Sequence, residues 1–442
     1  FFRNPVMWAG FIVAVLFDGL NIAKAVNPSV PALGRAVGIG SLFTERPWSA
    51  LAPVAIAFRP EILGFAYLVP LDISFSVWFF YLLLRFEGVG ALAAGYEIPF
   101  FPFDQEQGIG VYLALALVVL YVSRDHLRAV LRKVFGRAEQ PADTQEPLSY
   151  RVAVCGGLVA FALMLLIAIG AGMHWLLALT YFAIVLGVAV VYAKLRAEGG
   201  APMIWLFPFW QQERFITNLV GYKALAPGSN YRSLTIFSSM MLLSRGYFPQ
   251  FSGYQVESLK MAEQGNLGRR PMFWVMMGAM LYGLLCAYWI HFTAYYKYGA
   301  NVLEEGTTAG GFRVMLARQE YDRLSNAMRN PPGPDMLRSG AALAGFALTL
   351  LLVLGRKLFL RSPFHPFGLA MACSYGAPIW SPFFGAWLAK LLAQRLGGMR
   401  MYRALAPAFL GLVLGHFFAS GAWGLASIFY PDVGQMWIIH FG

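Results

Sequence analysis

The sequence predicts an all-α polytopic integral membrane protein with about eight spanning helices and additional re-entrant or broken segments. Hydrophobic residues make up 58% of the 442-residue chain and charged residues only 13%, which is too little polar surface for a protein dissolved in water. Apolar segments of about 20 residues, the length that crosses a hydrocarbon core, recur from end to end. We therefore expect a single transmembrane helical domain over residues 1–442.

The candidate spans follow from length and low charge. Residues 152–193 carry no Asp, Glu, Lys or Arg and are interrupted by Gly170–Gly172, so we expect two spans joined by a tight turn. The further candidates are Met7–Val26, Ile62–Leu84, Ile109–Ser123, Met272–Tyr295, Ser339–Leu358 and Ala404–Phe429.

The distribution of basic residues orients these spans. The loop 124–151 is rich in arginine and is predicted to be cytoplasmic by the positive-inside rule. The paired spans leave and return, which places residues 194–271 on the same side. Within that segment Leu234–Leu243 is too short to cross and is interpreted as a re-entrant or interfacial piece. The loop 297–338 has nearly balanced charge and is predicted to be external, with an amphipathic helix in Gly311–Asn330.

Residues 364–388 are apolar but lie between two basic segments, Arg356–Arg361 and Lys390–Arg403. A full crossing would place one basic segment outside, so we expect a hairpin that enters the membrane and returns on the same side. Glycine and proline in "YGAPIWSP", residues 375–382, favour the turn of that hairpin, because broken helices are tolerated where protein or a cavity surrounds them.

Several functional classes lack support in the sequence. The net charge of +12 is typical of a membrane protein with basic cytoplasmic loops, so no nucleic-acid partner is predicted. The three cysteines stand singly in apolar segments and are interpreted as packing residues. No phosphate-binding loop, nucleophile motif or paired metal ligands are present, so we predict neither an enzyme nor a cofactor or metal site.

Asp72 stands near the middle of the apolar stretch "GFAYLVPLDISFSVWFF", Gly64–Phe80. A charged side chain at the centre of a spanning helix costs about 2.5–3.5 kcal/mol on insertion scales, so it normally faces a protein interior or a watery path. We expect Asp72 to lie in a translocation path. The alternative is a structural carboxylate that pairs with a basic side chain or caps the backbone freed by Pro70.

The first span places Asp18, Asn21 and Lys24 three residues apart, along one stripe of a helix. We expect this stripe to form a hydrophilic wall of a substrate cavity that ends at Asn27–Pro28. The alternative is a pairing of Asp18 with Lys24, together with extension of the Lys24 side chain to the membrane interface.

The histidines are scattered along the chain without any paired spacing. An intramembrane histidine can relay protons, but a single one is more often a hydrogen-bonded packing residue. We therefore interpret four of them as packing residues: His174, His291, His416 and His440.

Four stretches resemble proteins of the oligopeptide transporter superfamily and a bacterial branch related to it. The longest is "YQVESLKMAEQGNLGRRPMFWVMMGAMLYGLLCAYW", in which Leu259 and Lys260 precede a linker and the "RRPMF" run opens a span. The others are "LGGMRMYRALAPAFLGLVLGHFFASGAWGL", "NPSVPALG" and the stretch that contains Asp72. Members of that superfamily are longer, so the resemblance implies that this chain lacks N-terminal helices of a longer protein.

The resemblance implies a secondary active transporter of oligopeptides or metal chelates in a bacterial cytoplasmic membrane. It would be coupled to protons and work by alternating access. Within it, Asp72 is the first candidate for proton coupling and Asp18 the second. The expected pathway and substrate contacts are Asn21, Lys24, Asn27, Tyr254, Gln255 and Lys260. The implied partners are the substrate, the coupling ion and lipids, with a homo-oligomer or a larger membrane assembly as a further prospect. The alternative is a non-transporting membrane subunit or scaffold of a larger complex.

Overall fold

The computed structural model describes residues 2–136, 146–200, 206–244, 247–300, 302, 311–359, 361–374, 379–434 and 437. Where the sequence suggested one domain, the chain packs into two compact units. Unit 1 comprises Phe1–Ala114, Lys194–Pro208 and Ala341–Gly442. Unit 2 comprises Leu115–Ala193 and Phe209–Gly340.

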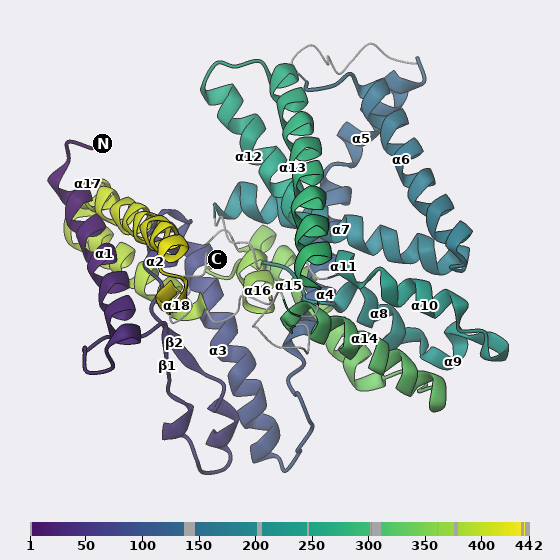
Figure 1. The fold of residues 1–442 in the computed structure, drawn as a ribbon, viewed down its shortest axis with the longest axis horizontal. Coiled ribbons are helices and arrows are strands. Elements are labelled where there is room, and N and C mark those ends of the chain that lie inside the picture. The colour runs from purple at the N-terminus through teal and green to yellow at the C-terminus, as the bar shows by residue number, and fades with distance from the viewer. Residues whose placement is uncertain are drawn as a thin grey trace. The chain divides into compact units, whose positions relative to one another are not determined.

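The described elements are mainly helices, labelled in Figure 1. The first part of the chain forms α1 (Pro5–Val26), β1 (Ala36–Gly38), η1 (Gly40–Leu42), η2 (Trp48–Leu51), β2 (Ala55–Ala57), α2 (Pro60–Leu68), α3 (Leu71–Ala93) and α4 (Asp104–Val122). The middle forms α5 (Arg124–Val134), α6 (Tyr150–Ala171), α7 (Trp175–Gly199), α8 (Gln211–Val220), α9 (Tyr222–Leu225), η3 (Pro227–Ser229), α10 (Arg232–Ser239), α11 (Met241–Ser244), α12 (Tyr247–Gln264), α13 (Arg269–Tyr298) and α14 (Gly311–Arg329). The last part forms α15 (Met336–Leu358), α16 (Pro366–Ala372), α17 (Trp380–Phe429) and α18 (Pro431–Gly434).

The predicted helical class is confirmed in its coarse form. Eight helices in the described part of the chain are long and apolar enough to cross a membrane: α1, α3, α4, α6, α7, α13, α15 and α17. The two short strands pair antiparallel in unit 1, with Val37 opposite Ile56. Residues 152–193 form two helices as predicted, and Gly172 closes α6 with a φ of 115°, a conformation that favours glycine.

The expected span Ile62–Leu84 is wrong, because the chain breaks within it. Helix α2 ends at Leu68 and α3 begins at Leu71. Pro70 lacks an N–H and forces Val69 into an extended conformation, with φ −61° and ψ 144°. Asp72 therefore lies in the first turn of α3 and not at the centre of a span.

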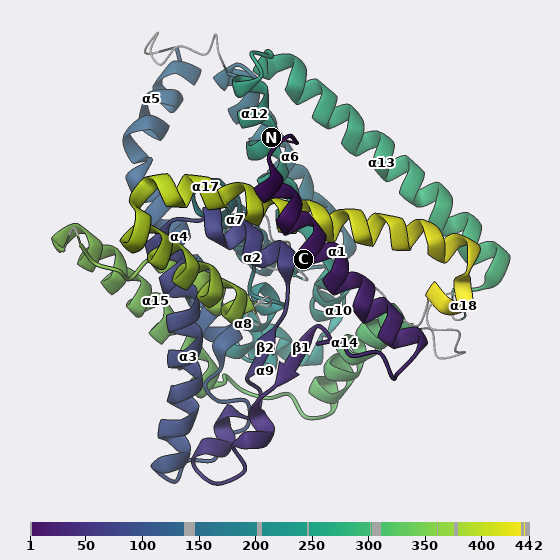
Figure 2. The ribbon, with the colours of Figure 1, turned by 90° about the vertical axis from the view of Figure 1, so that its left-hand side faces the viewer.

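The helix break near the C-terminus also differs from the expected one. Tyr375–Pro378, half of the predicted turn, lie outside the described residues. Pro382 and Gly385 are helical parts of α17, and the break in α17 falls at Gly398, where φ is 60° and ψ is −156°. Figure 2 shows α17 turning sharply before its second half continues to α18. The second half includes the predicted span Ala404–Phe429.

Glycines bring α1, α2 and the second half of α17 into backbone contact. A Cβ atom on Gly411 would lie 2.1 Å from the Met7 carbonyl oxygen, and one on Gly415 would lie 2.4 Å from that of Phe11. Gly64 of α2 similarly approaches the Phe409 carbonyl oxygen, at 2.3 Å from its virtual Cβ. The pair Gly411 and Gly415 has the small-xxx-small spacing that lets membrane helices approach closely. Figure 2 shows α1 crossing this part of α17.

The amphipathic segment Gly311–Asn330 forms helix α14, as predicted, and packs within unit 2. Arg323 of α14 pairs with Glu213 of α8, with 3.0 Å between Arg323 Nη2 and Glu213 Oε1. The expected re-entrant piece Leu234–Leu243 is divided between two short helices, α10 and α11. One of these, α10, also contacts α14.

These contacts bear on membrane topology. The charge pattern placed residues 194–271 inside and 297–338 outside, but α8 and α10 from the first segment pack against α14 from the second. The assignment of the two segments to sides of a membrane stays a prediction. Helix α12 packs along α13, as Figure 1 shows, and its 18 residues extend about 27 Å. The chain therefore runs along α13 through the length of α12 before α13 itself begins at Arg269.

The glycine contacts predict a position-specific effect of one methyl group. Gly411→Ala places a Cβ against the Met7 carbonyl and should lower the free energy of unfolding by about 1–3 kcal/mol. Gly421→Ala on the same helix is the matched control, because its Cβ meets nothing within 4 Å and alanine favours helix. Thermal unfolding of both variants in detergent measures the difference, and equal melting temperatures would contradict the packing.

Candidate functional site

A buried aspartate and histidine meet where α1 crosses α17. Asp18 Oδ2 and His416 Nδ1 lie 2.9 Å apart, and the side chains of Asp18 and His416 are only 5% and 6% exposed. Asp18 lies one helical turn after Ala14, which packs against Gly415, the neighbour of His416. The close helix crossing therefore sets this contact.

A second carboxylate lies on the other side of the same imidazole ring. Glu61 Oε2 is 3.5 Å from His416 Nε2, and the Glu61 side chain is 5% exposed. Glu61 stands in the first turn of α2, where the helix dipole favours a negative charge. Its other oxygen accepts a 2.8 Å hydrogen bond from Arg59 Nε. His416 thus connects carboxylates from two different helices. We call Asp18, His416, Glu61 and Arg59 the imidazole cluster.

The geometry of the imidazole cluster favours uptake of a proton. A neutral imidazole has one N–H and can donate to only one of the two carboxylates. A protonated imidazole donates from both nitrogens and carries a positive charge between two negative ones. Histidine is also the side chain whose ordinary titration range includes physiological pH. The arrangement can therefore hold and release a proton. Among the described residues, no group of three or more His, Cys, Asp or Glu is placed to hold a metal ion.

A pocket of about 320 Å³ reaches the imidazole cluster through Arg59. Its lining comes mainly from apolar residues of α1, α2 and α17, together with the segment around β2: Val13, Phe17, Leu33, Ile56, Ala57, Phe58, Arg59, Pro60, Leu63, Ser381, Pro382, Gly385 and Leu412. Phe17 is the neighbour of Asp18, and Arg59 is the ion-pair partner of Glu61. A molecule in this pocket would therefore sit beside the cluster.

The rest of the predicted polar stripe on α1 shapes the loop after that helix. Asn21 is buried, and its Oδ1 accepts a 2.8 Å hydrogen bond from the Gly34 N–H. Lys24 is exposed and donates to the Ala32 carbonyl at 3.0 Å. Asn27 is exposed at the C-cap of α1 and accepts from the Ser29 N–H at 3.1 Å. Asp18 pairs with His416 in the structure, and Lys24 donates to a backbone carbonyl instead of pairing with Asp18.

Asp72 occupies a different environment from Asp18. Its Oδ2 accepts a 2.8 Å hydrogen bond from Arg356 of α15, and its Oδ1 accepts one of 3.0 Å from the Ile73 N–H. The two charged side chains are 30% and 34% exposed. At the adjacent break between α2 and α3, Lys390 donates to the Val69 carbonyl at 2.6 Å. Asp72 is thus paired with an arginine. This matches the alternative interpretation of Asp72 as a structural carboxylate that pairs with a basic side chain.

The remaining predicted site residues lie in unit 2, on α12. Tyr254 is exposed, Gln255 is half-buried, and Lys260 pairs with Glu263 at 3.1 Å. The structure therefore divides the predicted set between the two units and brings only Asp18 and Asn21 into the buried part of unit 1.

Sequence reasoning missed His416, Glu61 and Arg59. His416 was interpreted as a packing residue, because no other histidine stands at a paired spacing. A usable signal was present in "GLVLGH", where His416 directly follows the small-xxx-small pair Gly411 and Gly415. A polar residue beside a close helix crossing is expected to meet the neighbouring helix.

A family model matches nearly the whole chain. It is described as "Family of unknown function (DUF6785)" and matches residues 1–438. No curated protein and no solved structure matches the chain. The resemblance to oligopeptide transporters accordingly stays a prediction. The matched region contains every residue of the imidazole cluster.

The Asp72 to Arg356 contact predicts a measurable coupling in stability. Because both side chains are about one-third exposed, the coupling energy in a double-mutant cycle of Asp72→Asn and Arg356→Gln should be modest, about 0.5–1 kcal/mol. Chemical denaturation of the two single variants and the double variant provides it. A coupling energy of zero would show that the pair does not contribute to the fold.

Proposed function

We propose that this chain, which belongs to the family of unknown function DUF6785, is a proton-coupled secondary transporter of oligopeptides or metal chelates that works by alternating access. The observation that carries the proposal is the imidazole cluster, in which His416 lies between the carboxylates of Asp18 and Glu61. Two of these residues stand on helices with the length and composition of membrane spans.

Proton binding at His416 offers a way to change the contacts of α2. With a neutral ring donating to Asp18, Glu61 faces a nitrogen that carries a lone pair. With a protonated ring, Glu61 gains a charge-assisted hydrogen bond, which is stronger than a neutral one. Helix α2 is short and ends at the break before Pro70, so it can respond separately from α3. A proton can bias a conformational equilibrium only through such a difference between states.

The neighbouring pocket supports a substrate role for this region. The pocket volume of about 320 Å³ lies in the usual range of small-molecule sites. The pocket is lined mainly by apolar side chains and also by Arg59. A substrate group that draws Arg59 away would weaken its hold on Glu61. Substrate and proton would then act on the same carboxylate, which is the physical requirement for coupling them. The substrate class itself comes from the resemblance to oligopeptide transporters.

A non-transporting subunit or scaffold of a membrane assembly is the second candidate. The specific observation in its favour is the pairing of Asp72 with Arg356, because a permanent ion pair has a structural role without any transported ion. The two candidates differ in what they require of His416. A scaffold needs only its packing, whereas a transporter needs its titration.

Uptake into proteoliposomes tests the proposal. Panels of peptides and metal chelates, with and without an imposed pH gradient, should identify a substrate whose accumulation depends on the gradient. His416→Gln and Asp18→Asn should abolish that accumulation, because neither variant can pass a proton between His416 and Asp18. His291→Gln, on the exposed surface of α13, is the matched histidine control and should transport normally.

The Asp72→Asn variant separates the two predicted coupling carboxylates. Since Asp72 is paired with Arg356, this variant should keep gradient-driven uptake if folded. Size-exclusion profiles and melting temperatures identify variants that fail to fold. Full gradient-driven uptake by folded His416→Gln protein would contradict the assigned coupling site. Absence of uptake across all panels by the folded parent protein would favour the scaffold.

A further inference from the structure

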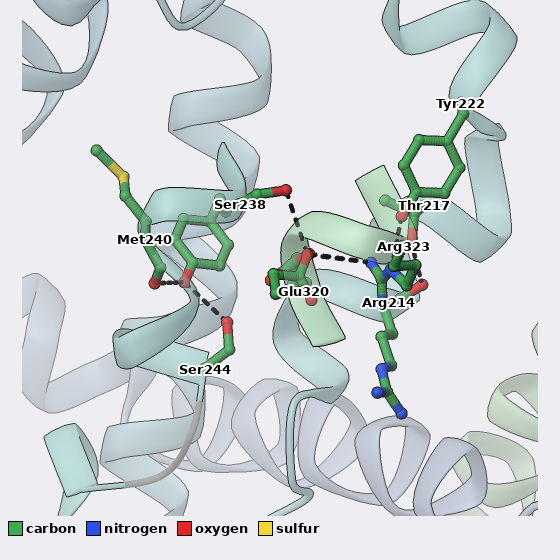
Figure 3. Close-up of polar contacts among 10 residues, drawn as sticks. Arg214, Thr217, Tyr222, Ser238, Met240, Ser244, Glu320 and Arg323 are labelled. Atoms are coloured by element: carbon green, nitrogen blue, oxygen red, sulfur yellow. Dashed lines mark hydrogen bonds and ion pairs between the residues drawn. The ribbon is translucent and has the colours of Figure 1, made fainter. Parts of the chain in front are cut away.

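A second group of buried charges lies in unit 2, on helices that are not among the candidate spans. Glu213 of α8 and Glu320 of α14 have side chains that are 3% and 4% exposed. Both approach Arg323, with Arg323 Nη2 at 3.0 Å from Glu213 Oε1 and 3.8 Å from Glu320 Oε1. Figure 3 shows Glu320 and Arg323 meeting at the centre of this group.

The surrounding groups leave Arg323 as the main compensating cation. Arg323 Nε donates a 2.8 Å hydrogen bond to the Tyr222 hydroxyl of α9, and Ser238 of α10 donates one of 3.2 Å to Glu320 Oε1. Both carboxyl groups thus lie against the same nitrogen of Arg323. An ionised carboxylate has no proton to donate, so two neighbouring carboxyl groups can hydrogen-bond to each other only when one of them is protonated.

We propose that Glu213 and Glu320 form a proton-binding site, in which one shared proton holds helix α14 against α8. With the proton present, one carboxylate balances the Arg323 guanidinium and the other carboxyl group donates a hydrogen bond. Without it, two buried negative charges lie beside Arg323 and repel each other. The site does not depend on the transport proposal, because it shares no residue with the imidazole cluster.

The electrostatics of Glu213 support this site. Burial raises the pKa of the Glu213 carboxyl well above its ordinary value, and the charge of Glu320 raises it further. Arg323 and Arg214 act in the opposite direction without cancelling these effects. The other titratable groups near Glu213 are Tyr181 of α7 and Tyr222 of α9.

The sign of the pH dependence follows from the direction of this shift. A carboxyl group with a raised pKa binds more protons in the folded state than in the unfolded state. Its stabilising contribution is complete below the ordinary glutamate pKa of 4.5 and is lost as the pH rises through the higher folded value. The contact between α8 and α14 should therefore weaken as the pH increases. Two backbone hydrogen bonds link α8 and its C-terminal end to the segment after α14: Tyr222 N–H to the Pro332 carbonyl and Asp335 N–H to the Asn218 carbonyl. The amide hydrogens of Tyr222 and Asp335 should therefore exchange faster as the pH increases.

Amide hydrogen exchange on the full chain, measured from pH 5 to pH 8 and corrected for intrinsic rates, tests the site. In the parent protein, protection of α8 and α14 should fall with increasing pH. Glu213→Gln supplies a neutral donor at every pH, so protection in this variant should be largely independent of pH. Glu263→Gln is the matched control, because Glu263 is an exposed glutamate of the same unit, and it should keep the parent behaviour.

Infrared difference spectra provide a second readout that does not depend on stability. The parent protein at neutral pH should show the carbonyl band of a buried protonated carboxylic acid, and Glu213→Gln should lose it. The site is contradicted if the parent and Glu213→Gln proteins have the same pH dependence of exchange. It is also contradicted if Glu213→Gln leaves the carboxylic acid band unchanged. If Glu213→Gln fails to fold, Glu320→Gln serves in both measurements, because it also replaces one of the paired carboxyl groups by an amide.

Discussion

Backbone contact between α1 and the second half of α17 is the constraint on which the rest of unit 1 depends. The helices approach until the position of a Cβ on Gly10 would lie 1.9 Å from the Ala408 carbonyl oxygen, so a larger residue could not occupy that position without separating the helices. This proximity buries Asp18 beside His416, since both stand next to small residues of the crossing. Helix α2 joins the same junction through Gly64 and contributes Glu61. A looser crossing would allow water to separate the three titratable groups.

Breaks in the helices place charged groups where continuous helices would not. Pro70 ends α2 and turns Asp72 into a residue of the first turn of α3, within reach of Arg356. The same break leaves the Val69 carbonyl to accept a hydrogen bond from Lys390. The chain turns back at Gly398 within α17. Helix α17 as a whole packs against both α2 and α3. The contacts of Asp72 and Lys390 are therefore a consequence of where proline interrupts the helices.

Five acidic groups in the described part of the chain have partners of three different kinds. Asp72 has a guanidinium partner that remains charged at all relevant pH values. Asp18 and Glu61 share an imidazole, a side chain whose ordinary titration range includes physiological pH. Glu213 and Glu320 both approach the guanidinium of Arg323. The kind of partner, more than burial itself, separates a fixed structural pair from a group that can exchange a proton.

The sequence by itself determined the helical class, the long apolar helices, the turn near Gly172 and the amphipathic helix α14, because these depend on composition and spacing within one segment. Only the tertiary structure decided which charges meet. Asp18 and His416 are 398 positions apart, Asp72 and Arg356 are 284 apart, and Glu213 and Arg323 are 110 apart. Residue types along a chain do not specify which helices become neighbours. The partners of the acidic groups follow from helix packing, which local patterns do not encode.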